Sequence, residues 1–428
     1  ESIFNVTDRN GQLVVTRSNT TGSRIFKNAY NTTGIVDGAT NLKVTKVLEG
    51  RDWQEGDSFS FVLSGNDDVT NTAIENEDIV LPDNANGITI TNENETKSAA
   101  FGNITIKKPG TYTFSISEDA SDPINGITYA DAKVITVIAT DKGNGTLDVT
   151  VSGNTETDLT FKNTYTPNEA TLNGAANLKV TKVIDGRDWL DTDEFSFKLE
   201  LADNETVFAK NDGKVILSNS TLTINKENKD SASFGDITFK EAGTYKFTVS
   251  EVEGSIPGVK YDTTPRTITV KVVDNKDGTM SATIVADESD DLTFTNKYTP
   301  NPVSIGATGL AVSKELKGRE WIDTDVFTFN IAAGNTVTKN AVEAEEITFE
   351  NTEIEINKPN SAACFGKITF TKTGDYVFKV TEKPGNIKGI TYDSSEKYIA
   401  VSVTDDNNGS LVATINNEPL LVFENTYA

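Results

Sequence analysis

Three polar residue types recur in the same order along this chain, each on the apolar face of a predicted β-strand. Successive strand side chains point to opposite faces of a sheet, so residues i, i+2 and i+4 share a face. By this rule the lysine lies on the apolar face of NLKVTKV, the glutamate on that of YTFSISE and the asparagine on that of LTFKNTY. The three sets are Lys46, Glu118 and Asn163; Lys182, Glu251 and Asn296; and Lys314, Glu382 and Asn425. An unpaired charge buried in this way is very costly, which indicates chemistry that removes it.

A lysine, a carboxyl group and a carboxamide buried together can form an amide bond. Burial lowers the pKa of the lysine and raises that of the glutamate, so the two groups can become a neutral amine and a neutral acid. The amine then attacks the side-chain carbonyl carbon of the asparagine. The protonated glutamate hydrogen-bonds the carbonyl oxygen and passes protons to the departing ammonia. We therefore predict a Lys–Asn isopeptide bond in each set, with Glu118, Glu251 and Glu382 as the catalytic residues.

The competing interpretation is that these side chains are simply solvated at strand ends. Three sets in the same register, all on the apolar face, favour the bond. Lys43 and Lys179 fall on the opposite face of the same strand and are predicted to be surface residues, and Ala311 stands at that position in the third set. Because each site is consumed by a single reaction on its own chain, we do not expect an enzyme that acts on an external substrate.

Composition narrows the remaining classes of function. The chain has 428 residues, with 39 Lys and Arg against 64 Asp and Glu, and its net charge of −25 argues against nucleic acid or an anionic membrane as partner. It has no histidine and one cysteine, which removes most support for zinc sites and for serine or cysteine catalysis. No cofactor or metal is expected. Cys364 aligns with Ala100 and Ser233 and is predicted to be a small packed residue.

Internal repetition predicts the architecture. The motif GRDW or GREW occurs three times, at 50–53, 186–189 and 318–321, and an alternating Phe-x-Phe strand follows it each time. Asn-Gly or Asp-Gly hairpin signals precede each final strand. Short strands with turn signals indicate an all-β protein of tandem immunoglobulin-like β-sandwich domains, each with its own isopeptide cross-link. The predicted limits of the repeats are 39–166, 175–299 and 307–428.

Residues 1–30 resemble only the end of a repeat. Asn10-Gly11 occupies the hairpin position and Asn28 the asparagine position, but no lysine or glutamate partner precedes them. We interpret 1–30 as the C-terminal strands of a truncated preceding repeat, with a strand donated to another molecule as the alternative. Such a segment is expected to be poorly ordered unless it pairs with something.

Two further motifs have competing interpretations. The three tryptophans can form an exposed ligand platform, but their fixed place before the Phe-x-Phe strand favours packing. The acidic turns DKGNGT, DNKDGT and DDNNGS faintly resemble calcium loops but lack the full ligand spacing, so hairpin turns are favoured.

The motifs together resemble a known family, the isopeptide-linkage domains of Gram-positive backbone pilins of the streptococcal T-antigen type, related to the B-type repeats of collagen adhesins. The resemblance rests on V-T-K in the first strand, a glutamate after an alternating aromatic run and F-x-N in the last strand. It implies an extracellular, cell-surface or cell-wall-attached stalk or fibre. The expected partners are neighbouring repeats of the same protein and other surface or pilus subunits, with no direct membrane contact. The alternatives are an adhesin module that binds a host protein or glycan, and a sortase-polymerised backbone pilin.

Overall fold

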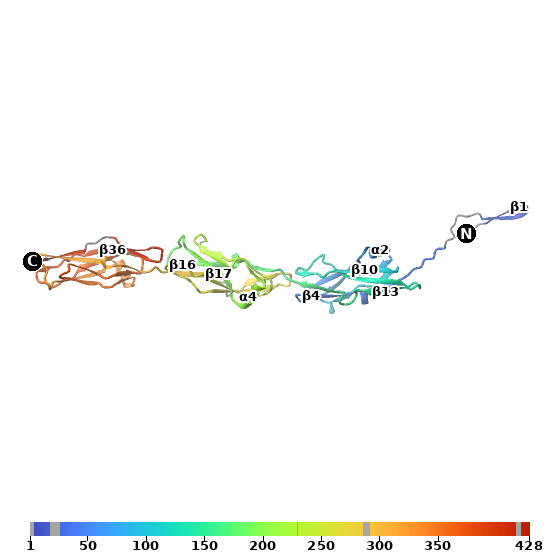
Figure 1. The fold of residues 1–428 in the computed structure, drawn as a ribbon, viewed down its shortest axis with the longest axis horizontal. Coiled ribbons are helices and arrows are strands. Elements are labelled where there is room, and N and C mark those ends of the chain that lie inside the picture. Colours follow the sequence, from blue (N-terminus) through green and yellow to red (C-terminus); the bar gives the residue numbers. More distant parts are fainter. Residues whose placement is uncertain (1–3, 18–25, 229, 286–291, 417–420) are drawn as a thin grey trace. The chain divides into compact units, whose positions relative to one another are not determined.

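The computed structural model describes residues 4–17, 26–228, 230–285, 292–416 and 421–428. Contacts divide the chain into two units, Glu1–Asn168 with Asp274–Thr279, and Glu169–Val273 with Met280–Ala428. Strands dominate every repeat and short helices lie between them, as the labelled α2 and α4 illustrate (Figure 1). The prediction of tandem β-sandwich domains is confirmed.

Repeat 1 contains three sheets and two short helices. Its five-stranded sheet has the order β13 (Leu147–Ser152), β12 (Lys133–Asp141), β10 (Gly110–Glu118), β5 (Ser58–Gly65) and β7 (Ile88–Thr91). Its four-stranded sheet has the order β11 (Ile127–Thr128), β14 (Thr160–Tyr165), β4 (Lys43–Glu49) and β8 (Ser98–Ala100). The third sheet consists of β3 (Gly34–Val36), β9 (Ile104–Ile106) and β6 (Ile79–Val80), and the helices are α1 (Gly38–Asn41) and α2 (Asp68–Glu75).

Repeat 2 has the same strand orders. Its five-stranded sheet is β25 (Met280–Ile284), β24 (Arg266–Asp274), β22 (Gly243–Glu251), β17 (Glu194–Leu201) and β19 (Thr221–Asn225). Its four-stranded sheet is β23 (Val259–Lys260), β26 (Thr293–Tyr298), β16 (Lys179–Asp185) and β20 (Ser231–Ser233). The third sheet is β15 (Ala170–Leu172), β21 (Ile237–Phe239) and β18 (Val215–Leu217), with helices α3 (Gly174–Asn177) and α4 (Asn204–Asn211).

Repeat 3 follows the same plan. Its five-stranded sheet is β37 (Leu411–Ile415), β36 (Lys397–Asp405), β34 (Gly374–Glu382), β29 (Val326–Ala333) and β31 (Glu353–Asn357). Its four-stranded sheet is β35 (Ile390–Thr391), β38 (Leu421–Tyr427), β28 (Ala311–Lys317) and β32 (Ala362–Cys364). The third sheet is β27 (Val303–Ile305), β33 (Ile368–Phe370) and β30 (Ile347–Phe349), with the 3₁₀ helix η1 (Ala307–Leu310) and α5 (Thr336–Glu343). The strands β3, β15 and β27 all precede the repeat limits expected from the sequence.

In each repeat the strand that carries the lysine and the last strand are parallel neighbours in the four-stranded sheet. In repeat 1, β4 pairs with β14 so that Lys46 lies opposite Phe161 and Leu48 opposite Asn163. The same register recurs between β16 and β26 and between β28 and β38. Parallel pairing places the lysine close to the asparagine of the last strand.

A separate apolar core lies between the sheets of each repeat. Phe61 of the five-stranded sheet and Phe161 of the four-stranded sheet are both fully buried, and their ring centroids lie 4.9 Å apart. The tryptophans of the GRDW and GREW motifs pack edge-on against the first phenylalanine of the next strand, with centroid distances of 5.2, 5.4 and 5.0 Å. The interpretation of these tryptophans as packing residues is therefore confirmed.

The eight-residue helices α2, α4 and α5 were not expected from the sequence. Each begins after an Asp or Asn N-cap, at Asp67, Asp203 and Asn335, whose side chain accepts a hydrogen bond from a backbone N–H in the first turn. Only one or two side chains per helix are buried, so the sequence shows too little apolar periodicity to predict a helix.

The N-terminal segment forms a hairpin of its own. Strands β1 (Phe4–Arg9) and β2 (Gln12–Arg17) are antiparallel, and Asn10 and Gly11 both have positive φ in the predicted turn. Its apolar side chains, such as Phe4 and Leu13, are exposed. Asn28 is exposed and lies outside any strand. Among the described residues, no helix is long and apolar enough to cross a membrane.

Candidate functional site

The three predicted lysines are buried in β4, β16 and β28. Lys46, Lys182 and Lys314 expose at most 2 % of their surface, and the alternate positions of the same strands are apolar core residues. Lys43 and Lys179, one step out of phase, are exposed as predicted. Strand alternation therefore identifies the buried lysine correctly.

Each lysine contacts the predicted glutamate, which reaches it from the opposite sheet. The distances from lysine Nζ to the nearest glutamate oxygen are 2.9 Å for Lys46–Glu118, 3.1 Å for Lys182–Glu251 and 2.9 Å for Lys314–Glu382. The glutamate side chains are at most 2 % exposed. Each lysine Nζ also donates to the backbone carbonyl of its phenylalanine neighbour on the last strand, at 3.1 to 3.3 Å.

The asparagines complete the three clusters. Asn163, Asn296 and Asn425 are fully buried, and each Nδ2 donates to Oε1 of its glutamate, at 3.0, 2.7 and 2.7 Å. In repeats 2 and 3 the lysine contacts the other oxygen, Oε2, so the carboxyl group bridges lysine and asparagine with its two oxygens. In repeat 1, Oε1 of Glu118 contacts both partners. All nine predicted residues thus meet in three buried clusters.

The asparagine carbonyl oxygen has a partner that was not predicted. Asn163 Oδ1 accepts a hydrogen bond from the backbone N–H of Ala130 at 2.8 Å, and the other two asparagines accept from Asp262 and Asp393, both at 2.7 Å. We expected the glutamate to hydrogen-bond this oxygen, and that detail is wrong because the carboxyl group faces the two nitrogens instead. Any residue type can supply a backbone N–H, so the sequence does not mark these donors. Each donor residue does directly follow the recurring tyrosine of ITYAD, VKYDT or ITYDS.

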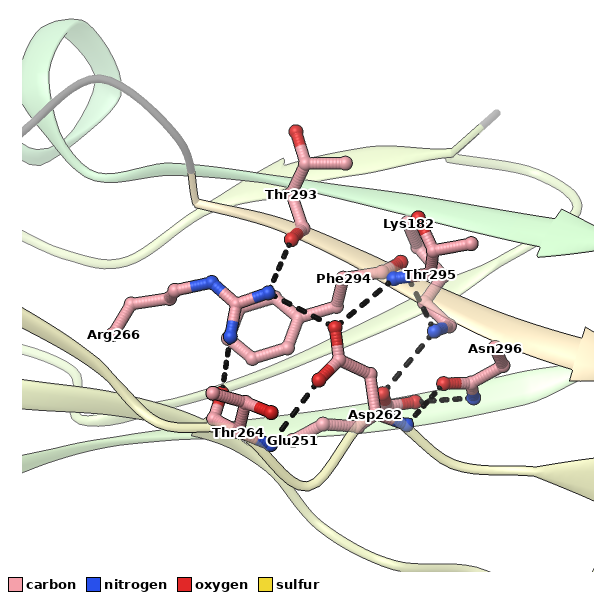
Figure 2. A network of polar contacts seen from close by, with 9 residues as sticks. All are labelled: Lys182, Glu251, Asp262, Thr264, Arg266, Thr293, Phe294, Thr295 and Asn296. Atoms are coloured by element: carbon pink, nitrogen blue, oxygen red, sulfur yellow. Dashed lines mark hydrogen bonds and ion pairs between the residues drawn. The ribbon is translucent and has the colours of Figure 1, made fainter.

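Repeat 2 shows what holds this backbone donor in place (Figure 2). The Asp262 carboxylate accepts from Arg266 at 2.9 Å and from the backbone N–H of Thr295 at 3.4 Å, beside Asn296 on β26. In repeat 3, Asp393 accepts from the backbone N–H groups of Ser395 and Glu424. These carboxylates tie the donor loop to the last strand.

The environment disfavours charge on the lysine and the glutamate. Burial lowers the pKa of Lys46 and of Lys182 to about 8, against the opposing effect of the nearby glutamate, and it also lowers the pKa of Lys314. Burial raises the pKa of Glu251 and of Glu382. In repeats 2 and 3 the directions for both partners match those predicted. They favour a neutral, nucleophilic amine beside a neutral acid.

Aromatic rings complete the wall of each cluster. The lysine Nζ lies 4.7 Å from the ring centroid of Phe59 in repeat 1, 5.0 Å from that of Phe195 in repeat 2 and 5.1 Å from that of Phe327 in repeat 3. These phenylalanines are the ones against which the tryptophans pack. The rings exclude water, which strengthens electrostatic interactions within the cluster.

One expectation outside the clusters is wrong. Cys364 is exposed at the end of the edge strand β32 and is not a packed residue. β32 pairs on one side only, with β28, so its last side chain need not face the core. The acidic turns form the predicted hairpin connections between β12 and β13, β24 and β25, and β36 and β37. Among the described residues, no group of His, Cys, Asp and Glu side chains is arranged to hold a metal ion.

The fold and the clusters define a class of protein: tandem β-sandwich repeats, each with a buried set of Lys, Glu and Asn contributed by three different strands. The sequence matches the family described as FctA, Spy0128-like isopeptide containing domain, over residues 42–166, 178–299 and 310–428. The chain belongs to this family.

Similar solved structures include the major pilin from Streptococcus pyogenes, with 21 % identity, a TM-score of 0.25, and coverage of 60 % of this chain and 98 % of that chain. A mutant of the shaft pilin SpaA from Lactobacillus rhamnosus GG has 11 % identity, a TM-score of 0.17, and coverage of 59 % of this chain and 98 % of that chain. The comparison with curated proteins gives no match.

Proposed function

We propose that this chain is a stalk segment of a cell-surface pilus or related fibre, and that each repeat strengthens itself with a Lys–Asn isopeptide bond. The observation that supports this proposal is the threefold recurrence of the buried cluster, in which the glutamate lies within 3.1 Å of both the lysine and the asparagine nitrogen in every repeat. We further propose that the segment is displayed outside the cell, attached to the wall, and assembles with other pilus subunits.

The reaction needs only groups present in the cluster. The neutral amine Nζ attacks the asparagine Cγ, the Nζ–Cγ bond forms, the Cγ–Nδ2 bond breaks and ammonia leaves. The glutamate contacts Nζ and Nδ2, so it is placed to take a proton from the first nitrogen and deliver it to the second. The backbone N–H of Asp262, and its counterparts, donates to the oxygen on which negative charge develops. Proximity in the folded repeat can supply about 7–11 kcal/mol of the barrier.

The position of the bond suits a protein under tension. Lysine and asparagine lie on adjacent parallel strands, close to where the chain enters and leaves the repeat. A force applied to the two ends would pass through the amide and would not reach the residues between Lys46 and Asn163. Closing a loop of that length also adds on the order of 4–5 kcal/mol of stability by the chain-entropy model.

Single-molecule stretching of the whole chain tests the proposal. With all three bonds formed, the chain should show no long unfolding steps. The variant Glu118→Ala should show one new step of roughly 40 nm, because about 117 residues between Lys46 and Asn163 become free to extend by about 3.3–3.6 Å each.

The matched control is Glu49→Ala, which removes a half-exposed glutamate from the same strand as Lys46. This variant should stretch like the unaltered chain. Long steps in the unaltered chain, one per repeat, would contradict the proposal.

A further inference from the structure

The tyrosine that ends each last strand belongs to a second recurring cluster, separate from the lysine sites. Its ring stacks on the arginine of the GRDW or GREW motif, with Cζ-to-centroid distances of 4.9 Å for Arg51–Tyr165, 4.9 Å for Arg187–Tyr298 and 5.0 Å for Arg319–Tyr427. Two side-chain hydrogen bonds hold each arginine on an aspartate six residues later, which is Asp57, Asp193 or Asp325. We call the arginine–tyrosine pair the tyrosine socket.

Glycines are required where the chain approaches this socket. Gly50 has a φ of +90°, and a Cβ there would lie 2.2 Å from the carbonyl oxygen of Tyr165. Gly186 and Gly318 stand in the same relation to Tyr298 and Tyr427, at 2.5 and 2.3 Å. The first two residues of the recurring motif therefore build the socket, and only its tryptophan packs in the core.

Two sockets hold a hairpin of the type Asp-x-x-x-Gly. Within the second unit, the Tyr298 hydroxyl donates to Asp405 Oδ1 at 2.8 Å and accepts from the backbone N–H of Gly409 at 3.3 Å. Within the first unit, the Tyr165 hydroxyl makes the same two bonds to Asp274 and Gly278, at 2.8 and 3.1 Å. Both tyrosines are only 3 % exposed, and burial raises the pKa of Tyr298 to about 12.

Backbone contacts extend the docking of the hairpin in the second unit. Asn301 donates its N–H to the carbonyl of Gly409 at 2.8 Å and accepts from the N–H of Leu411 at 3.0 Å. Gly409 has a φ of +82°, and a Cβ there would lie 2.7 Å from Pro257. Asp405 and Gly409 of the hairpin hydrogen-bond to Tyr298, the hairpin backbone hydrogen-bonds to Asn301, and Gly409 fits against Pro257 without room for a Cβ.

Tyr30 makes the same hydroxyl contacts with the hairpin of repeat 1. Its hydroxyl donates to Asp141 Oδ1 and accepts from the N–H of Gly145, both at 3.0 Å. Within the part of the chain that the structure describes, the tyrosine hydroxyl and the Asp-x-x-x-Gly hairpin therefore contact each other three times.

The third socket has the same construction but is open. Among the described residues, no hairpin contacts the Tyr427 hydroxyl, and Tyr427 is 39 % exposed. The Arg319 side chain is 19 % exposed, compared with 2 % for Arg51 and 5 % for Arg187. Ala428 donates its backbone N–H to Gly389 at 2.9 Å, as Thr299 does to Gly258 at 2.8 Å, so the backbone around the socket is already formed.

We propose that the tyrosine socket is a docking site for the Asp-x-x-x-Gly hairpin of another repeat of this family, and that the open socket at Arg319 and Tyr427 accepts such a hairpin. The partner must present an aspartate whose carboxylate accepts a hydrogen bond from the tyrosine hydroxyl. Four residues later it must present a glycine whose backbone N–H donates to the same hydroxyl. This docking does not depend on the isopeptide bonds.

The test uses the full chain extended after Ala428 by a second copy of residues 300–428. In this chain the added Asp405 lies as far along the sequence from Tyr427 as Asp405 lies from Tyr298. The chain then has two cysteines, the exposed Cys364 and its copy, which take spin labels for a distance measurement by pulsed electron paramagnetic resonance.

Docking should give a narrow distance distribution between the two labels. The variant Tyr427→Phe keeps the ring on Arg319 but removes the hydroxyl, and it should broaden the distribution by about twofold or more, because repeats joined only by a short linker move relative to each other. The change Asp405→Ala in the added copy should have the same effect. Tyr298→Phe is the matched control and should leave the distribution unchanged.

A distribution that is already broad in the extended chain, or one that Tyr427→Phe leaves unchanged, would overturn the proposal. The intact mass of each variant reports the cross-links separately, so this result and the outcome of the stretching experiment are independent.

Discussion

An isolated lysine charge on the apolar face of a strand is costly to bury. In all three repeats a glutamate carboxyl group contacts the lysine. The geometry assigns different tasks to three neighbours. The glutamate contacts both nitrogens, the last strand supplies a carbonyl to the lysine, and a backbone N–H holds the asparagine oxygen. Converting the lysine amine into a neutral amide would remove the cost of burying a lysine charge, which is several kcal/mol.

A pH-dependence measurement tests the cost of the buried lysine. In Asn296→Ala the bond cannot form, so Lys182 remains a buried amine whose pKa burial holds at about 8, below its ordinary value of 10.5. Between these pH values the unfolded chain binds more protons than the folded repeat. The stability of repeat 2 should therefore rise from pH 8 to pH 10.5, by about 1 kcal/mol per pH unit at the steepest point.

Urea unfolding of repeat 2 at pH 8 and pH 10 measures this difference. The double variant Lys182→Met with Asn296→Ala lacks the amine and serves as the control. If both variants gained equal stability between the two pH values, the depressed lysine pKa would be refuted.

At the scale of elements, each short helix is joined to the central strand by one buried threonine. Thr70 of α2 is fully buried, and its hydroxyl oxygen accepts from the backbone N–H of Thr113 at 2.9 Å. Thr206 and Thr338 make the same contact with β22 and β34, at 2.9 and 2.8 Å. This contact supplies a hydrogen-bond partner to a backbone N–H of the strand that ends in the glutamate of the cluster.

Removing that hydroxyl should destabilise the repeat without changing its shape. Thr70→Val leaves the N–H of Thr113 buried and unpaired, which should lower the free energy of unfolding of repeat 1 by about 1–3 kcal/mol. Thr70→Ser retains the hydroxyl and should recover most of this loss. Denaturant unfolding of the two variants measures the difference, and equal stability would show that the hydrogen bond contributes nothing.

The strands of the site were predictable from the sequence, whereas the elements around them were not. Strand alternation identified all nine cluster residues because a buried polar side chain interrupts an otherwise apolar face. It could not identify the backbone donor at Ala130, Asp262 or Asp393, since any residue type supplies an N–H. The arginine–aspartate pairs have a recurring spacing of six residues, which is a signal present in the sequence.

At the scale of the whole molecule, the three repeats can be compared with one another, because a variant in one repeat leaves the other two as internal controls. Each has its own core and its own cluster, so a change in one repeat should leave the other two intact. Each occupied tyrosine socket contacts a hairpin that lies more than 100 residues away in the sequence. These contacts depend on the glycine and arginine of the recurring motif and on the glycine of the hairpin. Both partners recur in the sequence, but recurrence alone does not show that the hairpin and the socket contact each other.

The intact mass of the purified chain is the most direct test of the cross-links. Each bond releases one ammonia, about 17 Da, so the chain should weigh about 51 Da less than its sequence. The variant Glu118→Ala should retain two bonds and weigh about 34 Da less than its own sequence. A chain whose mass equals that of its sequence would contain no isopeptide bond, which would contradict the proposed reaction in all three repeats.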